Sequence, residues 1–148
     1  MTVIVDTTAW YAYFVAKDLF HNEAIGYFQT KPQLITTNTV FEETIALIHH
    51  RQGKRVAVAA GKNIQEICGA NFRYITSHED EEILDLYKKS IRGLDYVDAS
   101  VVWLARKLDI PIFTFDAHFK TIKMITFHKI LCLHYRNCRM HITRLSHI

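Results

Sequence analysis

The chain has 148 residues, of which 49% are hydrophobic and 22% are charged, proportions that suit one globular domain and argue against disorder. Its three cysteines (Cys68, Cys132 and Cys138) include no close pair, so we expect no disulfide framework and a reducing, cytoplasmic setting. The N-terminus lacks the basic start and apolar run of a secretory signal, and no apolar stretch approaches the roughly 20 residues that span a bilayer.

The net charge of +3 is divided unevenly along the chain. Residues 1–116 carry 12 basic and all 15 acidic residues, whereas residues 117–148 carry six basic residues and no acid. A basic tail of this kind can attract phosphate or an acidic partner, and it fits a solvated terminus equally well. We therefore predict one domain over residues 1–148, in which 122–148 is a basic C-terminal segment of unassigned role.

Short apolar strands alternate with helices along the chain. In chain order, the pattern predicts a strand at Thr2–Val5, a helix from Thr7 with a threonine cap, a helix at His21–Thr30, a strand at Gln33–Thr36, helices at Thr39–His50 and Arg55–Cys68, a strand at Phe72–Thr76, helices at Ser77–Ile91 and Tyr96–Leu108, and strands at Ile110–Phe115 and Ile130–His134. This alternation predicts an α/β fold with a mostly parallel sheet. Ligands of such sheets bind beyond the carboxyl ends of the strands.

Two acids directly follow predicted strands. Asp6 comes after TVIV and Asp116 after IPIFTF, so both should lie at the carboxyl edge of the sheet. On the helix Tyr96–Leu108, Asp98 falls at the border of the apolar face, where a carboxylate is costly unless a cation pairs with it. Asp95 is interpreted as the N-cap of the same helix.

The helix after the second strand contributes a further acid. Glu42 and Glu43 both flank its apolar face, and helical geometry favours Glu43 only slightly. Two unit charges 4 Å apart repel by about 4 kcal/mol at an effective dielectric constant near 20, so clustered carboxylates must raise their pKa values or bind a cation. Carboxylate oxygens suit Mg²⁺ or Mn²⁺, which can activate water for phosphodiester hydrolysis.

Four segments in this order (VIVDTTAW, TTNTVFEE, YVDAS and TFDAHF) resemble the PIN domain, and within it the VapC-type ribonuclease toxins. The resemblance covers about residues 2–121. It implies a three-layer α/β/α sandwich with a central, mostly parallel sheet, and RNA cleavage that depends on Mg²⁺ or Mn²⁺. It selects Glu43 over Glu42, and it makes the catalytic residues and metal ligands Asp6, Glu43, Asp98 and Asp116. It also implies an antitoxin protein as partner and a homodimer.

Other residues are weaker candidates. Thr7 and Thr114 could donate hydrogen bonds to a ligand carboxylate or to metal-bound water, although capping and turn roles fit them nearly as well. A basic patch that could bind RNA phosphate, or be basic by chance, comprises Arg51, Lys54 and Arg55. The tail has four possible zinc ligands whose spacing does not fit the usual zinc fingers: Cys132, His134, Cys138 and His141.

Three functional hypotheses follow. The leading one is a metal-dependent endoribonuclease that acts as the toxin of a type II toxin–antitoxin pair. The second is a catalytically silent PIN-like module that binds RNA or protein. The third is a phosphoryl-acceptor signalling domain, which requires a lysine at the end of a late strand; this chain has Asp116 there, and Lys120 lies beyond it.

Overall fold

The computed structural model describes residues 1–89, 94–121 and 130–132. The strands are β1 (Thr2–Val5), β2 (Gln33–Thr37), β3 (Phe72–Arg73), β4 (Ile112–Thr114) and β5 (Ile130–Cys132). The helices are α1 (Thr7–Phe14), α2 (His21–Gln29), α3 (Asn38–Gln52), α4 (Lys54–Cys68), α5 (Ser77–Lys89) and α6 (Tyr96–Leu108), with 3₁₀ turns η1 (Gly69–Asn71) and η2 (Ala117–Thr121). The predicted order of elements is therefore confirmed.

All strand pairs in the sheet are parallel, and the strand order is β3-β2-β1-β4-β5. From β1 the chain first adds β2 and β3 on one side and later adds β4 and β5 on the other. The winding direction thus reverses between β1 and β4. In open α/β sheets this switch point is where ligands bind, and Asp6 and Asp116 follow the two strands that flank it.

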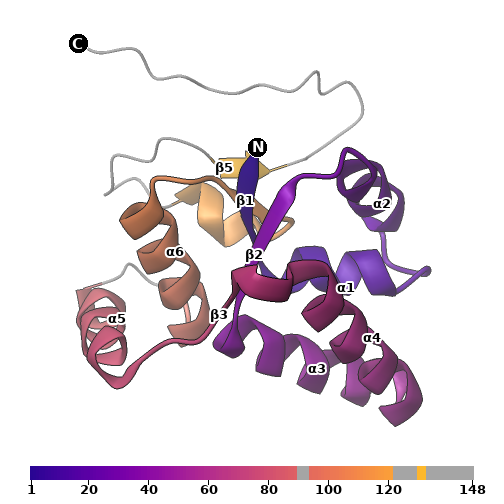
Figure 1. The fold of residues 1–148 in the computed structure, drawn as a ribbon, viewed down its shortest axis with the longest axis horizontal. Coiled ribbons are helices and arrows are strands. Elements are labelled where there is room, and N and C mark those ends of the chain that lie inside the picture. The colour runs from indigo at the N-terminus through magenta and orange to yellow at the C-terminus, as the bar shows by residue number, and fades with distance from the viewer. Residues whose placement is uncertain (90–93, 122–129, 133–148) are drawn as a thin grey trace.

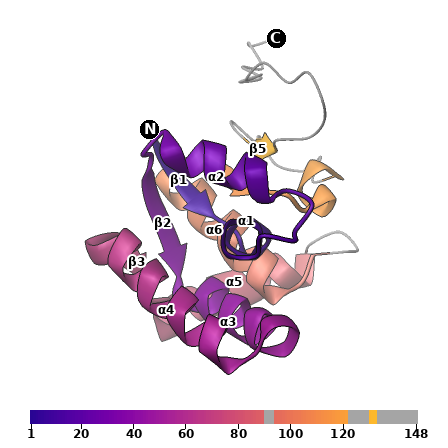
Figure 2. The same cartoon turned by 90° about the vertical axis from the view of Figure 1, so that its right-hand side faces the viewer.

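Helices cover both faces of the sheet (Figures 1 and 2). Helices α5 and α6 lie on one side, whereas α1, α2 and α4 lie on the other. Helix α3 begins directly after β2 and packs against α1, α4 and α6. The fold is a three-layer α/β/α sandwich with a central parallel sheet, as predicted.

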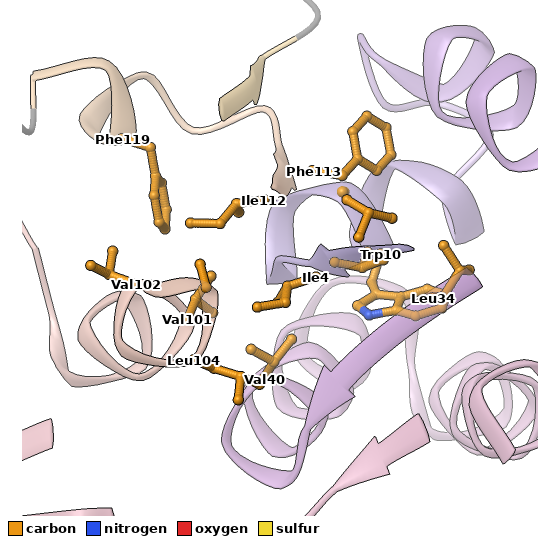
Figure 3. Close-up of a cluster of buried hydrophobic side chains, with 14 of the residues drawn as sticks. Ile4, Trp10, Leu34, Val40, Val101, Val102, Leu104, Ile112, Phe113 and Phe119 are labelled. Atoms are coloured by element: carbon orange, nitrogen blue, oxygen red, sulfur yellow. The ribbon is translucent and has the colours of Figure 1, made fainter. Parts of the chain in front are cut away.

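The core explains why β1 is apolar along its length. Its residues Val3–Val5 are fully buried, because helices cover the strand on both faces. Successive side chains point to opposite faces. Figure 3 shows Ile4 on the side of α6 with Val101 and Leu104, and it shows Trp10 of α1 on the other side with Leu34 and Phe113.

The predicted threonine cap of α1 is wrong. The N-cap is Asp6, whose side chain accepts a hydrogen bond from the Thr8 backbone N at 3.3 Å. Thr7 is the first residue of the helix instead. The first acid of the predicted site therefore also begins α1, at the positive end of the helix dipole.

Two strands are shorter than predicted, because hydrogen bonds to side chains of other elements end them. β3 stops at Arg73 rather than Thr76, and the Ile75 backbone N donates to the Asn38 side chain at 2.9 Å. β4 is confined to Ile112–Thr114 because the preceding residue is a proline, which has no N–H, and the Phe115 backbone N donates to Thr8 Oγ1 at 3.0 Å.

Some predictions fall outside the described residues. These include most of the basic segment 122–148, with the possible zinc ligands His134, Cys138 and His141. β5 covers the first part of the predicted strand Ile130–His134. The single-domain boundaries stay a prediction. In the part of the chain that is described, no helix has the length and apolar character needed to cross a membrane.

Candidate active site

Asp6 is buried at the switch point between β1 and β4. Its side chain is 2% exposed, and its backbone N donates to the Phe113 carbonyl of β4 at 3.0 Å. Asp6 Oδ2 accepts hydrogen bonds from Thr114 Oγ1 and Thr8 Oγ1, each at 2.8 Å. Burial raises the pKa of Asp6, and these donors oppose the rise. The carboxylate is thus firmly oriented in a place that disfavours its negative charge.

Thr7 connects Glu43 to the same end of the sheet. Thr7 Oγ1 donates to Glu43 Oε2 at 2.5 Å, and this hydrogen bond connects α1 to α3. Burial is the main cause that raises the pKa of Glu43, and the charges of Asp95 and Asp6 add to it. Glu42 is exposed. Of the two glutamates, Glu43 is therefore the one that is hydrogen-bonded at this end of the sheet.

Asp98 lies in the first turn of α6 and forms a capping box with Asp95. Asp95 Oδ1 accepts from the Asp98 backbone N at 2.9 Å, and Asp98 Oδ2 accepts from the Asp95 backbone N at 3.0 Å. Burial first, and then the charges of Asp95, Asp6 and Asp116, raise the pKa of Asp98 to about 7. Asp95 is the N-cap of α6, as predicted. Its charge also raises the pKa of Asp98, an effect that the sequence analysis did not consider.

Asp116 follows β4 and is held by local hydrogen bonds. Its backbone N donates to Thr114 Oγ1 at 2.9 Å. Its Oδ1 accepts from the His118 backbone N at 2.8 Å and lies 3.0 Å from His118 Nδ1. Sequence reasoning missed both His118 and Thr8, for which the only signal is that each lies two residues after an acid of the site.

The four acids therefore come from separate elements to one edge of the sheet. Within the described ranges, the hydrogen bonds to Glu43, Asp98 and Asp116 each involve a single carboxylate oxygen, which leaves the other oxygen for a ligand. In the same ranges, no three acidic, histidine or cysteine side chains are placed so that they could hold one metal ion. The donor atoms of the four acids are oxygens, which suit a hard divalent cation.

The basic patch Arg51, Lys54 and Arg55 is exposed where α3 meets α4. The Arg51 guanidinium lies over the Tyr11 ring, 5.3 Å from its centre. Arg51 follows Glu43 by two helical turns, which is about 12 Å along the axis of α3. The structure thus does not bring the patch into the acidic site, and a substrate must extend along α3 to contact both.

A sequence model of the PIN domain matches residues 3–124, which is most of the chain. The chain belongs to the PIN domain family. The acidic edge described above lies entirely within the matched residues, whereas most of the basic C-terminal segment lies beyond them.

Relatives of this chain include VapC-type toxins, which confirms the resemblance to that subgroup. The 23S rRNA-specific endonuclease VapC20 of Mycobacterium tuberculosis is 32% identical over 120 residues, which cover 79% of this chain and 91% of VapC20. The crystal structure of VapC20, described as a sarcin–ricin loop cleaving toxin, matches with a TM-score of 0.72 at 29% identity and covers 83% of this chain and 96% of that one.

A more distant structure shares the fold alone. FitAcB from Neisseria gonorrhoeae has a TM-score of 0.58 at 9% identity, with 78% of this chain and 88% of that chain covered.

Proposed function

We propose that this chain is a Mg²⁺- or Mn²⁺-dependent endoribonuclease and the toxin of a type II toxin–antitoxin pair. The endoribonuclease class is supported by membership of the PIN domain family and by VapC20, which is an endonuclease specific for 23S rRNA. The observation that carries the metal requirement is the set of acids at the switch point, of which Asp6 is buried and the others are half-buried. Burial raises the pKa values of Asp6 and Asp98, and a divalent cation relieves that cost by pairing with their charge.

The proposal gives each residue of the site a role. Oxygen ligands for the ion come from Asp6, Glu43, Asp98 and Asp116. A bound ion of this kind activates water and stabilises the charged phosphate oxygens of a phosphodiester. The hydroxyls of Thr8 and Thr114 orient Asp6, and that of Thr7 orients Glu43. This chemistry would require no nucleophilic side chain from the protein.

Cleavage of RNA by the purified full chain tests this proposal. A 23S rRNA fragment that includes the sarcin–ricin loop is the first substrate to try, because VapC20 is described as cleaving that loop. We expect cleavage with Mg²⁺ or Mn²⁺ and none in EDTA. Asp6→Asn and Asp98→Asn should abolish it, whereas Glu42→Gln, which changes an exposed acid on α3, should leave it unchanged. Activity that survives both Asp→Asn changes would overturn the proposal.

RNA binding by the basic patch is a further part of the proposal. Because phosphate contacts release counterions, alanine at Arg51, Lys54 and Arg55 together should weaken RNA binding and reduce its dependence on salt concentration. Binding isotherms at several salt concentrations measure both effects. An unchanged salt dependence would remove the patch from the substrate path.

The proposed biology adds an antitoxin partner, a homodimer and a cytoplasmic location. The antitoxin is supported by the description of VapC20 as a toxin. Co-expression with the product of a neighbouring gene, followed by co-purification, tests for the antitoxin, and light scattering of the purified chain measures its oligomeric state.

A further inference from the structure

A chain of hydroxyl groups joins the start of α3 to the first turns of α6. Thr37 Oγ1 lies 2.8 Å from Thr39 Oγ1, which in turn lies 2.9 Å from Ser100 Oγ. Thr37 and Ser100 are fully buried, and Thr39 is half-buried. The chain therefore crosses from one acid-bearing helix to another through the interior of the protein.

The Ser100 end of this hydroxyl chain determines which atom donates at every step. The Val40 backbone N donates to Thr37 Oγ1 at 3.2 Å, and Ser100 Oγ donates to the Val97 carbonyl at 2.7 Å. A hydroxyl has only one proton. Ser100 therefore accepts from Thr39, and Thr39 accepts from Thr37. Every hydroxyl donates once and accepts once, so the chain has a single direction from a backbone amide to a backbone carbonyl.

The link between the helices lies close in sequence to two acids of the site. Glu43 follows Thr39 by one turn of α3, and Asp98 precedes Ser100 by two residues on α6. Both carboxylates lie close enough to Asp6 for its charge to raise their pKa values. A buried hydrogen bond between Thr39 and Ser100 holds the two acid-bearing helices against each other.

We propose that the hydroxyl chain Thr37–Thr39–Ser100 sets the spacing of Glu43 and Asp98, and so positions them for a divalent cation. This inference rests on the proposed metal site, and these three residues act through the acids rather than on the substrate. Groups that orient ligands are important for metal affinity, since ligands that are already in place need less reorganisation on binding.

Substitutions at Thr39 test the link with little change in shape. Thr39→Val leaves Ser100 without its donor and Thr37 without its acceptor, whereas Thr39→Ser keeps a hydroxyl at the same position. We expect Thr39→Val to weaken Mn²⁺ binding by about 10-fold or more, and we expect Thr39→Ser to restore it. Calorimetric titration of the full chain with Mn²⁺ measures the affinity without RNA.

Thr44→Val provides a matched control. Thr44 is also on α3 and fully buried, and its hydroxyl has no hydrogen-bond partner within the described residues. The change should leave Mn²⁺ affinity as in the wild type. Thermal unfolding without metal shows that all variants are folded at the temperature of the titration; if Thr39→Val is not folded there, Ser100→Ala breaks the same contact from α6.

The outcomes separate the two proposals. If the wild-type chain does not bind Mn²⁺, the proposed metal site fails and this inference fails with it. If the wild type binds but Thr39→Val binds equally well, only the positioning role is wrong. The role is also wrong if Thr39→Ser binds as weakly as Thr39→Val, or if Thr44→Val weakens binding to the same extent.

Discussion

Asp98→Asn should stabilise the metal-free protein while it removes a proposed metal ligand. Burial, and then the charges of Asp95, Asp6 and Asp116, raise the pKa of Asp98 from 3.8 to about 7, so ionised Asp98 opposes folding. Asparagine has no charge, yet its amide oxygen can accept the hydrogen bond from the Asp95 backbone N that closes the capping box. The substitution therefore removes repulsion and keeps the cap.

The size of the gain follows from the pKa. The rise to about 7 corresponds to at most about 4 kcal/mol, at about 1.4 kcal/mol for each pKa unit. Asp98 is half-buried, so solvent screens part of this cost. We expect a gain of about 1–2 kcal/mol in the free energy of unfolding at pH 8.

The sign of the pH dependence follows from linkage. The pKa of Asp98 is higher in the folded state than its ordinary value of 3.8. The stability linked to its protonation is therefore fully present below about pH 3.8 and is lost as the pH rises through about 7. The gain from Asp98→Asn should therefore be largest above pH 7 and should shrink towards zero near pH 4.

Urea denaturation in EDTA at pH 5 and pH 8, followed by circular dichroism, measures this gain. Glu42→Gln is the control, because it removes an exposed acid of α3 and leaves the charge of Asp98 in place. With Mn²⁺ added, the wild type should gain more stability than Asp98→Asn, because a ligand stabilises the state that binds it. An equal gain at pH 5 and pH 8, or a loss at pH 8 in EDTA, would refute the reasoning from burial and repulsion.

Three further predictions concern stability. Thr8→Val should destabilise the protein by about 1–3 kcal/mol, because the buried Asp6 carboxylate loses a hydroxyl donor; thermal denaturation measures this, and an unchanged melting temperature would contradict it. Asp109→Gly should stabilise by about 1 kcal/mol, because Asp109 has a φ of 53° and its charge lies at the negative end of α6; a lower melting temperature would argue against it. Glu79→Gln should lower the free energy of unfolding by about 1–3 kcal/mol at pH 7. The reason is that the buried Glu79 carboxylate has its pKa lowered to about 2 by hydrogen bonds from Thr76, Lys107 and Arg73. A lowered pKa means that the stability is present above about pH 4.5 and is lost as the pH falls through about 2. The difference between Glu79→Gln and wild type should therefore narrow over that range, and a difference that stays constant with pH would show that charge is not its cause.

The fold class could be predicted from the sequence because its signals are local. A parallel strand that is covered on both faces needs a continuous apolar run, which TVIV provides at β1. The ends of β3 and β4 could not be predicted in the same way. They depend on hydrogen bonds that backbone N–H groups donate to the side chains of Asn38 and Thr8, which belong to other elements.

The acids of the site also differ in whether the sequence alone could place them. Asp6 and Asp116 could be placed from their positions after strands, because parallel strands end at one edge. The choice between Glu42 and Glu43 needed a family resemblance, since helical periodicity separated them poorly. The hydrogen bond from Thr7 to Glu43 Oε2, and the exposure of Glu42, supply the physical distinction.

By itself the sequence determined the alternation of elements, the family, and the order in which the acids follow the strands. Only the tertiary structure decided how those acids are held: Asp6 by Thr8 and Thr114, and α3 against α6 by Thr39 and Ser100. The physical reason is separation along the chain. Thr114 and Asp6 are 108 positions apart, and Thr39 and Ser100 are 61 apart. No local pattern encodes a hydrogen bond over such a distance, because the partner is chosen by how the layers pack.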